Sequence, residues 1–185
     1  MILASRSPQR RAILEQLGVE FTVVAPEVEE LSDGDARALA LENALRKARA
    51  VRGERVLGVD TEVVLDGRVF GKPRDAEEAG TFLRRLSGRT HEVMSGVALC
   101  LPHGEERTDV AITRVRFRLL EQRDIDWYLR SGEWRERAGG YAIQGRGAAL
   151  IAGIEGDYWN VVGLPVAALV ELAPELFEWP GTIEP

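Results

Sequence analysis

The stretch LASRSPQRRAILEQLG (residues 3–18) places serines and arginines at the start of an expected helix. Ser7 suits the N-cap position and Pro8 the first helical position. The free N–H groups and the positive dipole end of a helix start attract anions, and a cation such as Arg10 is unfavourable there unless an anion is present. The stretch is therefore either a phosphate-binding turn or a capped helix with solvated arginines.

Acidic and basic residues that could act on a bound phosphate lie further along the chain. Asp60, in VLGVDTEVV, ends an apolar run, where an aspartate is a structural acid, a metal ligand or a general base. Lys72, in FGKP, follows the return strand of the same expected hairpin, so it either faces a common cleft with Asp60 or is an exposed lysine before a turn. Glu29 and Glu30 are adjacent and point in different directions, so at most one of them faces a site.

Two further residues each have an ordinary and a functional interpretation. Lys47 lies late in an expected helix beside other basic residues, and a solvated lysine is the usual explanation. Gln144 lies in YAIQGRGA, next to glycines that permit close approach of a ligand. Its amide can donate and accept at once, which suits a base edge, but a turn amide has the same pattern.

Hydrophobic periodicity and turn residues predict an α/β fold in which strands and helices intermix without strict βαβ alternation, which favours a mixed, curved sheet. A hairpin is predicted over 56–72, because Asp66-Gly67 is a type I′ turn signal. The other expected strands are 1–4, 20–24, 91–101 and 107–118, with short strands in the glycine-rich region 138–165. The expected helices are 8–17, 35–51, 75–88, 121–131 and one that begins at Pro165, and a loose tail follows from Pro180.

Length and composition suit one domain spanning residues 1–185, with two lobes. The net charge of −6 argues against nucleic acid as the main partner. The single cysteine, Cys100, lies in an apolar stretch, where a buried, inert thiol is expected, and it excludes an intrachain disulfide. No apolar run approaches the ~20 residues of a membrane span, and no signal peptide is recognised, so we expect a cytoplasmic protein without a membrane partner.

Taken together and in order, these stretches resemble the Maf family of nucleoside triphosphate pyrophosphatases, also called septum-formation inhibitors. The matching pieces are LASRSPQRRAILEQLGVEF, EVEE, ALRKARAV, VLGVDTEVVLDGRVFGKP, LRRLSGRTHEVMSGVAL, AGGYAIQGRGA and VVGLP. The resemblance implies a mixed, strongly bent sheet flanked by helices, with two lobes around a deep cleft, as in the inosine triphosphate pyrophosphatases. It further implies cleavage between the α and β phosphates, a divalent cation (Mg²⁺ or Mn²⁺) and a homodimer.

The resemblance also assigns roles to individual residues. Asp60 matches the family's proton acceptor, and other cleft positions are matched by Ser7, Arg10, Glu30, Lys47 and Lys72. We expect Asp60 or Glu30 to hold the metal. Thr61 and Gln144 match positions of substrate choice and are typical of the dTTP/UTP branch. That branch normally has arginine, also a residue of substrate choice, where this chain has Gln9.

Two alternatives stay open at this point. The chain could be a non-catalytic, nucleotide-binding regulator of septum formation, although Asp60, Glu30 and Lys72 are not needed for simple binding. It could also be an enzyme that removes modified pyrimidine nucleotides from the nucleotide pool.

Overall fold

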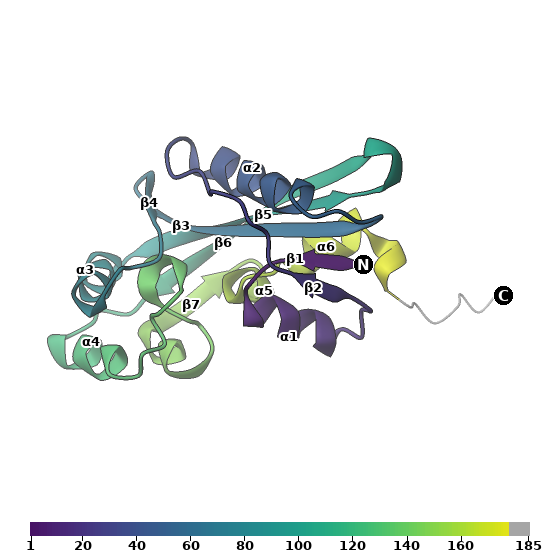
Figure 1. Cartoon of the computed structure of the whole chain (residues 1–185). Helices are drawn as coiled ribbons and strands as arrows, with labels where there is room; N and C mark the ends of the chain where they lie inside the picture. The colour runs from purple at the N-terminus through teal and green to yellow at the C-terminus, as the bar shows by residue number, and fades with distance from the viewer. Residues whose placement is uncertain (178–185) are drawn as a thin grey trace.

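The computed structural model describes residues 1–177 and is built around a mixed seven-stranded sheet (Figure 1). The strand order is β2-β1-β3-β5-β6-β7, with β4 paired to β3. The strands are β1 (Ile2–Ala4), β2 (Thr22–Val24), β3 (Val56–Leu65), β4 (Arg68–Phe70), β5 (Thr90–Cys100), β6 (Glu106–Phe117) and β7 (Ile151–Glu155). β1 pairs in parallel with β2 and β3, and the other pairs are antiparallel. The expected mixed α/β sheet is confirmed.

Six α-helices in the described residues flank this sheet. They are α1 (Pro8–Gln16), α2 (Ala36–Arg49), α3 (Ala76–Leu86), α4 (Gln122–Leu129), α5 (Tyr158–Val162) and α6 (Val166–Leu172). The first three begin where the sequence predicts, because the side chains of Ser7, Asp35 and Asp75 each accept a backbone N–H in the first turn. The hairpin turn is also confirmed, with Asp66 and Gly67 at φ 51° and 73°.

The glycine-rich region differs from the prediction of several short strands. It contains 3₁₀ turns at Ala138–Gly140 and Gly145–Leu150, followed by one strand, β7, and the short helix α5. Glycines at positive φ let the chain turn repeatedly here, so no second strand forms. Cys100 is partly exposed rather than buried. The tail predicted from Pro180 lies outside the described residues.

Strand β3 is paired unequally on its two sides. On one side it pairs with β5 from Val56 to Val64 without a break. On the other side β1 pairs with residues 56–58 and β4 with residues 63–65. Residues 59–62 therefore have no strand beside them on that side, within the part of the chain that the structure describes.

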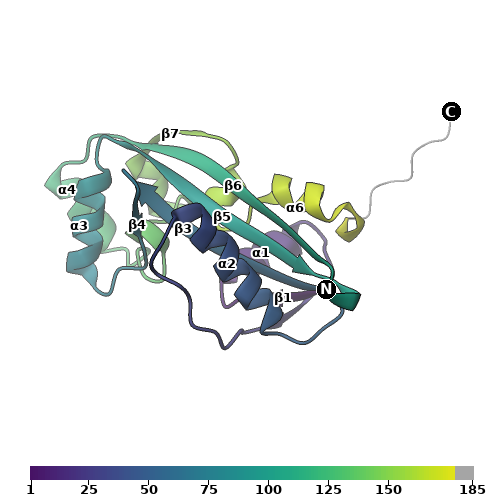
Figure 2. The same cartoon turned by 90° about the horizontal axis from the view of Figure 1, so that it is seen from above.

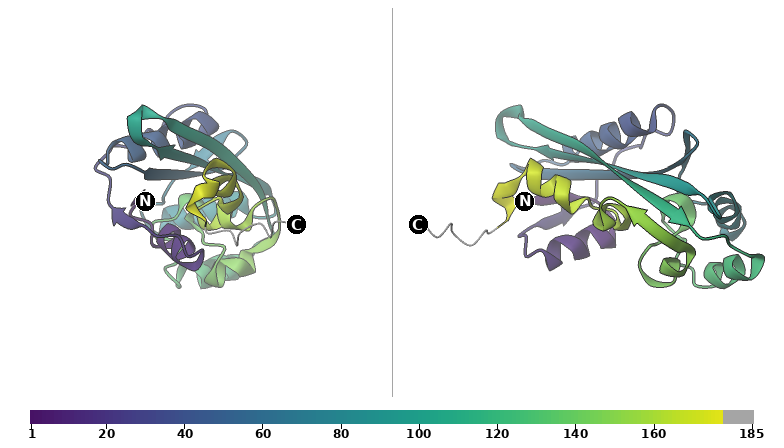
Figure 3. Two further views of the ribbon diagram at one scale, coloured as in Figure 1. Left: turned by 90° about the vertical axis from the view of Figure 1, so that its right-hand side faces the viewer. Right: turned by 180° about the vertical axis from the view of Figure 1, so that it is seen from behind.

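The helices cover the two faces of the sheet: a small, alanine-rich cluster lies under α2, and the other helices build two larger cores. Helix α2 lies on one face, over β3 and β5, and α1, α5 and α6 lie on the other (Figures 1 and 2). One core joins α1 and α6 to β3 and β5 through Leu14, Leu57 and Leu169. The other joins α3 and α4 to the far halves of β3, β5 and β6 through Leu83 and Tyr128. The two cores lie toward opposite ends of the long strands, which agrees with the expected two lobes (Figure 3).

Within residues 1–177, no helix combines the length and apolar character that crossing a membrane requires.

A buried aromatic group around His91 contributes to the second core. The Nε2 atom of His91 lies 2.8 Å from the hydroxyl of Tyr141, and both rings pack edge-on against Phe117. Burial lowers the pKa of His91 to about 4, and its Nδ1 atom has no hydrogen-bond partner among residues 1–177. The imidazole is therefore neutral in the folded protein at neutral pH.

This burial predicts a stability loss in mild acid. The unfolded chain takes up a proton at His91 below about pH 6.5, whereas the folded protein resists it down to about pH 4. Between about pH 7 and pH 5, the wild type should lose about 2 kcal/mol more free energy of unfolding than His91→Gln, measured by urea denaturation. Equal losses in the two proteins would contradict the assignment.

Candidate active site

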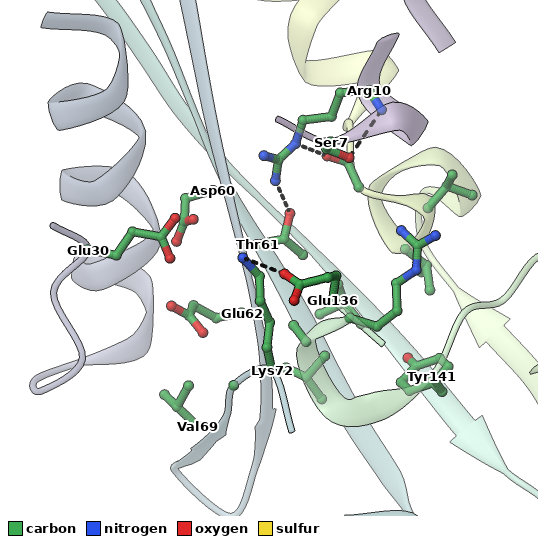
Figure 4. A pocket seen from close by; sticks show the side chains of 18 of the residues that line it. Ser7, Arg10, Glu30, Asp60, Thr61, Glu62, Val69, Lys72, Glu136 and Tyr141 are labelled. Carbon is green, nitrogen blue, oxygen red and sulfur yellow. Dashed lines mark hydrogen bonds and ion pairs between the residues drawn. The ribbon is translucent and has the colours of Figure 1, made fainter. Parts of the chain in front are cut away.

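A cavity of about 500 Å³ opens beside residues 59–62 of β3, on the side where no strand of the described chain pairs with them. Seven of the nine predicted site residues line it: Ser7, Arg10, Glu30, Lys47, Asp60, Thr61 and Lys72. They come from the turn before α1 and α1 itself, the segment before α2 and α2 itself, β3, and the segment after β4, and Figure 4 labels all of them except Lys47. The topology explains why these residues meet. β1 and β4 both end beside residues 59–62 of β3, and the chain that follows each strand enters this space from opposite sides.

The centre of the cavity is an ammonium group between two carboxylates. Nζ of Lys47 lies 2.5 Å from Oδ1 of Asp60 and 2.6 Å from Oε1 of Glu30. The side chains of Lys47 and Asp60 are 9% and 8% exposed, so the ordinary interpretation of Lys47 as a solvated helical lysine does not apply. Partial burial opposes ionisation of Glu30, but Lys47, Lys72 and Arg10 together lower its pKa. Glu30 is thus the acid of the adjacent pair that faces the site.

Asn43 fixes the geometry of this group and was not foreseen from the sequence. It lies one turn before Lys47 on α2, so both side chains are on the same face of the helix. Its amide nitrogen donates to Oδ2 of Asp60 at 3.3 Å and to the carbonyl of Leu31 at 3.0 Å, and its oxygen accepts the N–H of Leu31. Asn43 therefore ties the segment carrying Glu30 to both the helix and Asp60.

Arg10 supplies a second buried cation at the cavity. Its Nε donates to the carbonyl of Gly163, and its two terminal nitrogens donate to the hydroxyls of Ser5 and Thr61. Burial lowers its pKa, against the smaller opposing effects of Asp60 and Glu30. A guanidinium has five N–H donors, so two remain after these three bonds. The protein therefore fixes the position of Arg10 and leaves two of its N–H groups available to an anion.

Thr61 is linked to a second hydroxyl behind it. Its Oγ1 accepts from Arg10 at 3.1 Å and lies 2.8 Å from Oγ of Ser95, a fully buried residue on β5. Because Thr61 pairs with Ser95 across the strands, the register of β3 and β5 holds this hydroxyl in place. Thr61 and Arg10 therefore form one connected unit at the cavity wall.

Glu62 is a third acid in the cavity that was missed in the sequence. It follows Asp60 by two positions on β3, so the two side chains are on the same face of the strand. Partial burial, and then the charges of Asp60 and Glu30, raise the pKa of Glu62 to about 7. The strand period was the signal that could have identified it.

Lys72 lies at the mouth of the cavity. Its side chain is 54% exposed, and its Nζ is 4.0 Å from a carboxylate oxygen of Glu136 on the opposite wall (Figure 4). At this exposure the pair contributes little to stability. Lys72 is therefore a cation that an incoming anion can draw away from Glu136.

The remaining two predicted residues, Gln9 and Gln144, lie apart from the charged group. They line an adjacent cavity of about 220 Å³, whose wall includes Tyr141, as does the wall of the larger cavity. Glu133 holds the chain next to Gln144, because its carboxylate accepts the N–H groups of Arg146 and Gly147. The structure thus divides the predicted residues between a charged cavity and an adjacent amide cavity, named for Gln9 and Gln144, whose wall also includes Glu133 and Arg137.

The carboxylates of the charged cavity suit a hard divalent cation. Among the described residues, no group of three or more His, Cys, Asp or Glu side chains is placed to hold a metal ion. Mg²⁺ is commonly bound by only one or two carboxylates, with waters and substrate phosphates completing its shell. Glu30 and Asp60, whose second oxygens are not bonded to Lys47, fit a metal of that kind.

The sequence model of the family described as Maf-like protein matches residues 1–176. The chain belongs to this family. Similar proteins named dTTP/UTP pyrophosphatase come from Symbiobacterium thermophilum and Myxococcus xanthus. The first is 51% identical over an alignment that covers 93% of this chain and 91% of the relative, and the second is 48% identical and covers 93% and 90%. Another, from Thermus thermophilus, is 49% identical and covers 93% of this chain and 92% of its own.

Two solved structures are more distant from this Maf chain. A nucleoside-triphosphatase / dITP/XTP pyrophosphatase from Mycobacterium abscessus has 20% identity and a TM-score of 0.46, covering 95% of this chain and 98% of its own. A HAM1 protein from Coxiella burnetii has 18% identity and a TM-score of 0.47, covering 94% and 98%.

The buried ion group of this Maf protein predicts a strong coupling between two substitutions. Lys47→Met should lower the free energy of unfolding by about 3 kcal/mol, because it leaves Asp60 buried without its counter-charge. Adding Asp60→Asn should recover about 1 kcal/mol or more of that loss, measured by urea denaturation.

The matched control is Arg46→Met, which removes a half-exposed ion pair on the same helix and should cost less than about 1 kcal/mol. A double variant as unstable as the sum of its two single variants would contradict the coupling.

Proposed function

We propose that this chain hydrolyses dTTP and UTP to the nucleoside monophosphate and pyrophosphate, using a divalent cation. The observation that carries the proposal is one cavity whose cations include Arg10, Lys47 and Lys72 and face a cluster of carboxylates. Several cations suit a triphosphate, and carboxylates beside them suit a metal and a proton acceptor. The names of relatives about half identical over nearly the whole chain point to the same reaction.

In this proposal each polar group has a separate task. Arg10 and Lys72 bind phosphate oxygens, and Ser7 at the start of α1 adds a hydroxyl. Glu30 and Asp60 would hold the divalent cation, Mg²⁺ or Mn²⁺, which would supply positive charge against the phosphate oxygens. Lys47 orients Asp60 through its contact with Oδ1, so that the carboxylate of Asp60 can take the proton of the attacking water.

Base selection is assigned to the amide cavity beside the charged one. Gln144 offers a donor and an acceptor to a pyrimidine edge, and Gln9 lies in the same cavity. Thr61, through its bond to Arg10, connects this choice to the phosphate side. A homodimer remains a prediction from the family resemblance, and a cytoplasmic location remains a prediction from the sequence.

The proposal predicts that Asp60→Asn lowers kcat for pyrophosphate release from dTTP by at least about 100-fold. The measurement is pyrophosphate release from a panel of canonical and modified nucleoside triphosphates with Mg²⁺ or Mn²⁺. Asp66→Asn is the matched control, since this exposed turn residue lies outside both cavities and asparagine accepts its positive φ. Near-normal release by a folded Asp60→Asn protein would overturn the role of Asp60.

A second prediction concerns Gln9. Gln9→Arg adds a cation and five donors to the amide cavity, so the ranking of nucleotides by kcat/KM should change more than kcat on the best substrate. Gln16→Arg makes the same exchange at an exposed position of α1 and should change neither quantity. A uniform change across all nucleotides would count against a role for Gln9 in base choice.

A further inference from the structure

Arg137 is the basic residue that lines both cavities. It contributes to the charged cavity with Asp60 and Lys72, and to the amide cavity with Gln9 and Gln144. It therefore stands where the phosphate-binding and base-binding ends of a nucleotide would meet. The sequence did not single it out.

The guanidinium of Arg137 has no hydrogen bond or ion pair within residues 1–177, and its Nε is buried without an acceptor. The nearby acids are already engaged: Glu133 accepts two backbone N–H groups, and Glu136 faces Lys72. Burial lowers the pKa of Arg137, against smaller opposing effects of Tyr128 and Glu133. Arg10 is the contrast, because three of its donors are bonded to the protein.

The backbone around Arg137 is held firmly against the sheet. Gly139 donates its N–H to the carbonyl of Gly71 at 3.1 Å, which joins this segment to the chain after β4. A Cβ on Gly139 would lie 2.9 Å from Cγ1 of Val63, so glycine permits this close approach to β3. An arginine with unused donors is thus positioned at the junction of the cavities by the fold and not by an ion pair.

We propose that Arg137 binds the α-phosphate, the phosphate that stays on the monophosphate product. The proposal rests on the proposed function and deepens it. In a nucleoside triphosphate the α-phosphate is the phosphate nearest the sugar and base. Arg137 is a cation in the wall of the cavity to which the base is assigned, so the α-phosphate is the phosphate that it can reach. A planar guanidinium with free N–H groups matches the oxygens of a phosphate, and partial burial strengthens that contact.

The test is calorimetric binding of dTMP and of pyrophosphate, each to the wild type and to Arg137→Gln. The variant should bind dTMP about tenfold or more weakly, as expected for loss of a charge-assisted hydrogen bond, and pyrophosphate within about twofold of the wild type. Arg137→Lys should recover part of the dTMP affinity, because it keeps the charge without the fork of donors. In turnover, KM for dTTP and UTP should rise by a common factor.

Arg135→Gln is the matched control, because Arg135 is exposed, stacks on Trp134 and lines neither cavity. Equal losses of dTMP and pyrophosphate affinity, a changed base preference, or no change at all would each overturn the proposal. If wild type releases no pyrophosphate but Arg137→Gln still loses dTMP affinity selectively, the proposed reaction fails while the monophosphate site stands. Absence of dTMP binding to the wild type would overturn the site itself.

Discussion

Interrupted pairing along one side of β3 decides where the functional residues of this protein can meet. β5 pairs with β3 continuously, whereas β1 and β4 cover only its ends on the other side, so no strand of the described chain pairs with residues 59–62 on that side. Backbone groups in such a gap must find other partners or water, so the gap is a natural place for a polar cavity. Asp60, Thr61 and Glu62 lie in it, and the chains leaving β1 and β4 bring Ser7 and Lys72 to its two ends.

The second requirement is the close approach of α2 to the sheet. A Cβ on Gly58 would lie 2.1 Å from the carbonyl oxygen of Ala44, and one on Gly96 would lie 2.2 Å from that of Ala40. Because these two strand positions are glycine, the helix backbone rests directly on β3 and β5. Lys47 then reaches Asp60 from the next turn of the helix, where a more distant helix would leave the carboxylate buried and unpaired.

Much of the fold could be predicted from local chemistry, and much of the site could not. Helix starts followed from capping side chains, and the hairpin from its Asp-Gly turn. Lys47 has the helical spacing of a solvated lysine, so only the packing of α2 reveals its burial. Arg137 could not be identified from the sequence, because its lack of partners within residues 1–177 is a property of the folded chain. The 3₁₀ turn at Gly139 likewise depends on close contact with β3.

The central claim is that this protein breaks the bond between the α and β phosphates of its substrate. Phosphorus NMR of dTTP incubated with the wild-type protein and Mg²⁺ identifies the products directly. The account predicts dTMP and pyrophosphate in equal amounts, with neither dTDP nor orthophosphate formed. Appearance of dTDP with orthophosphate, or dTTP that stays intact with either Mg²⁺ or Mn²⁺, would contradict it.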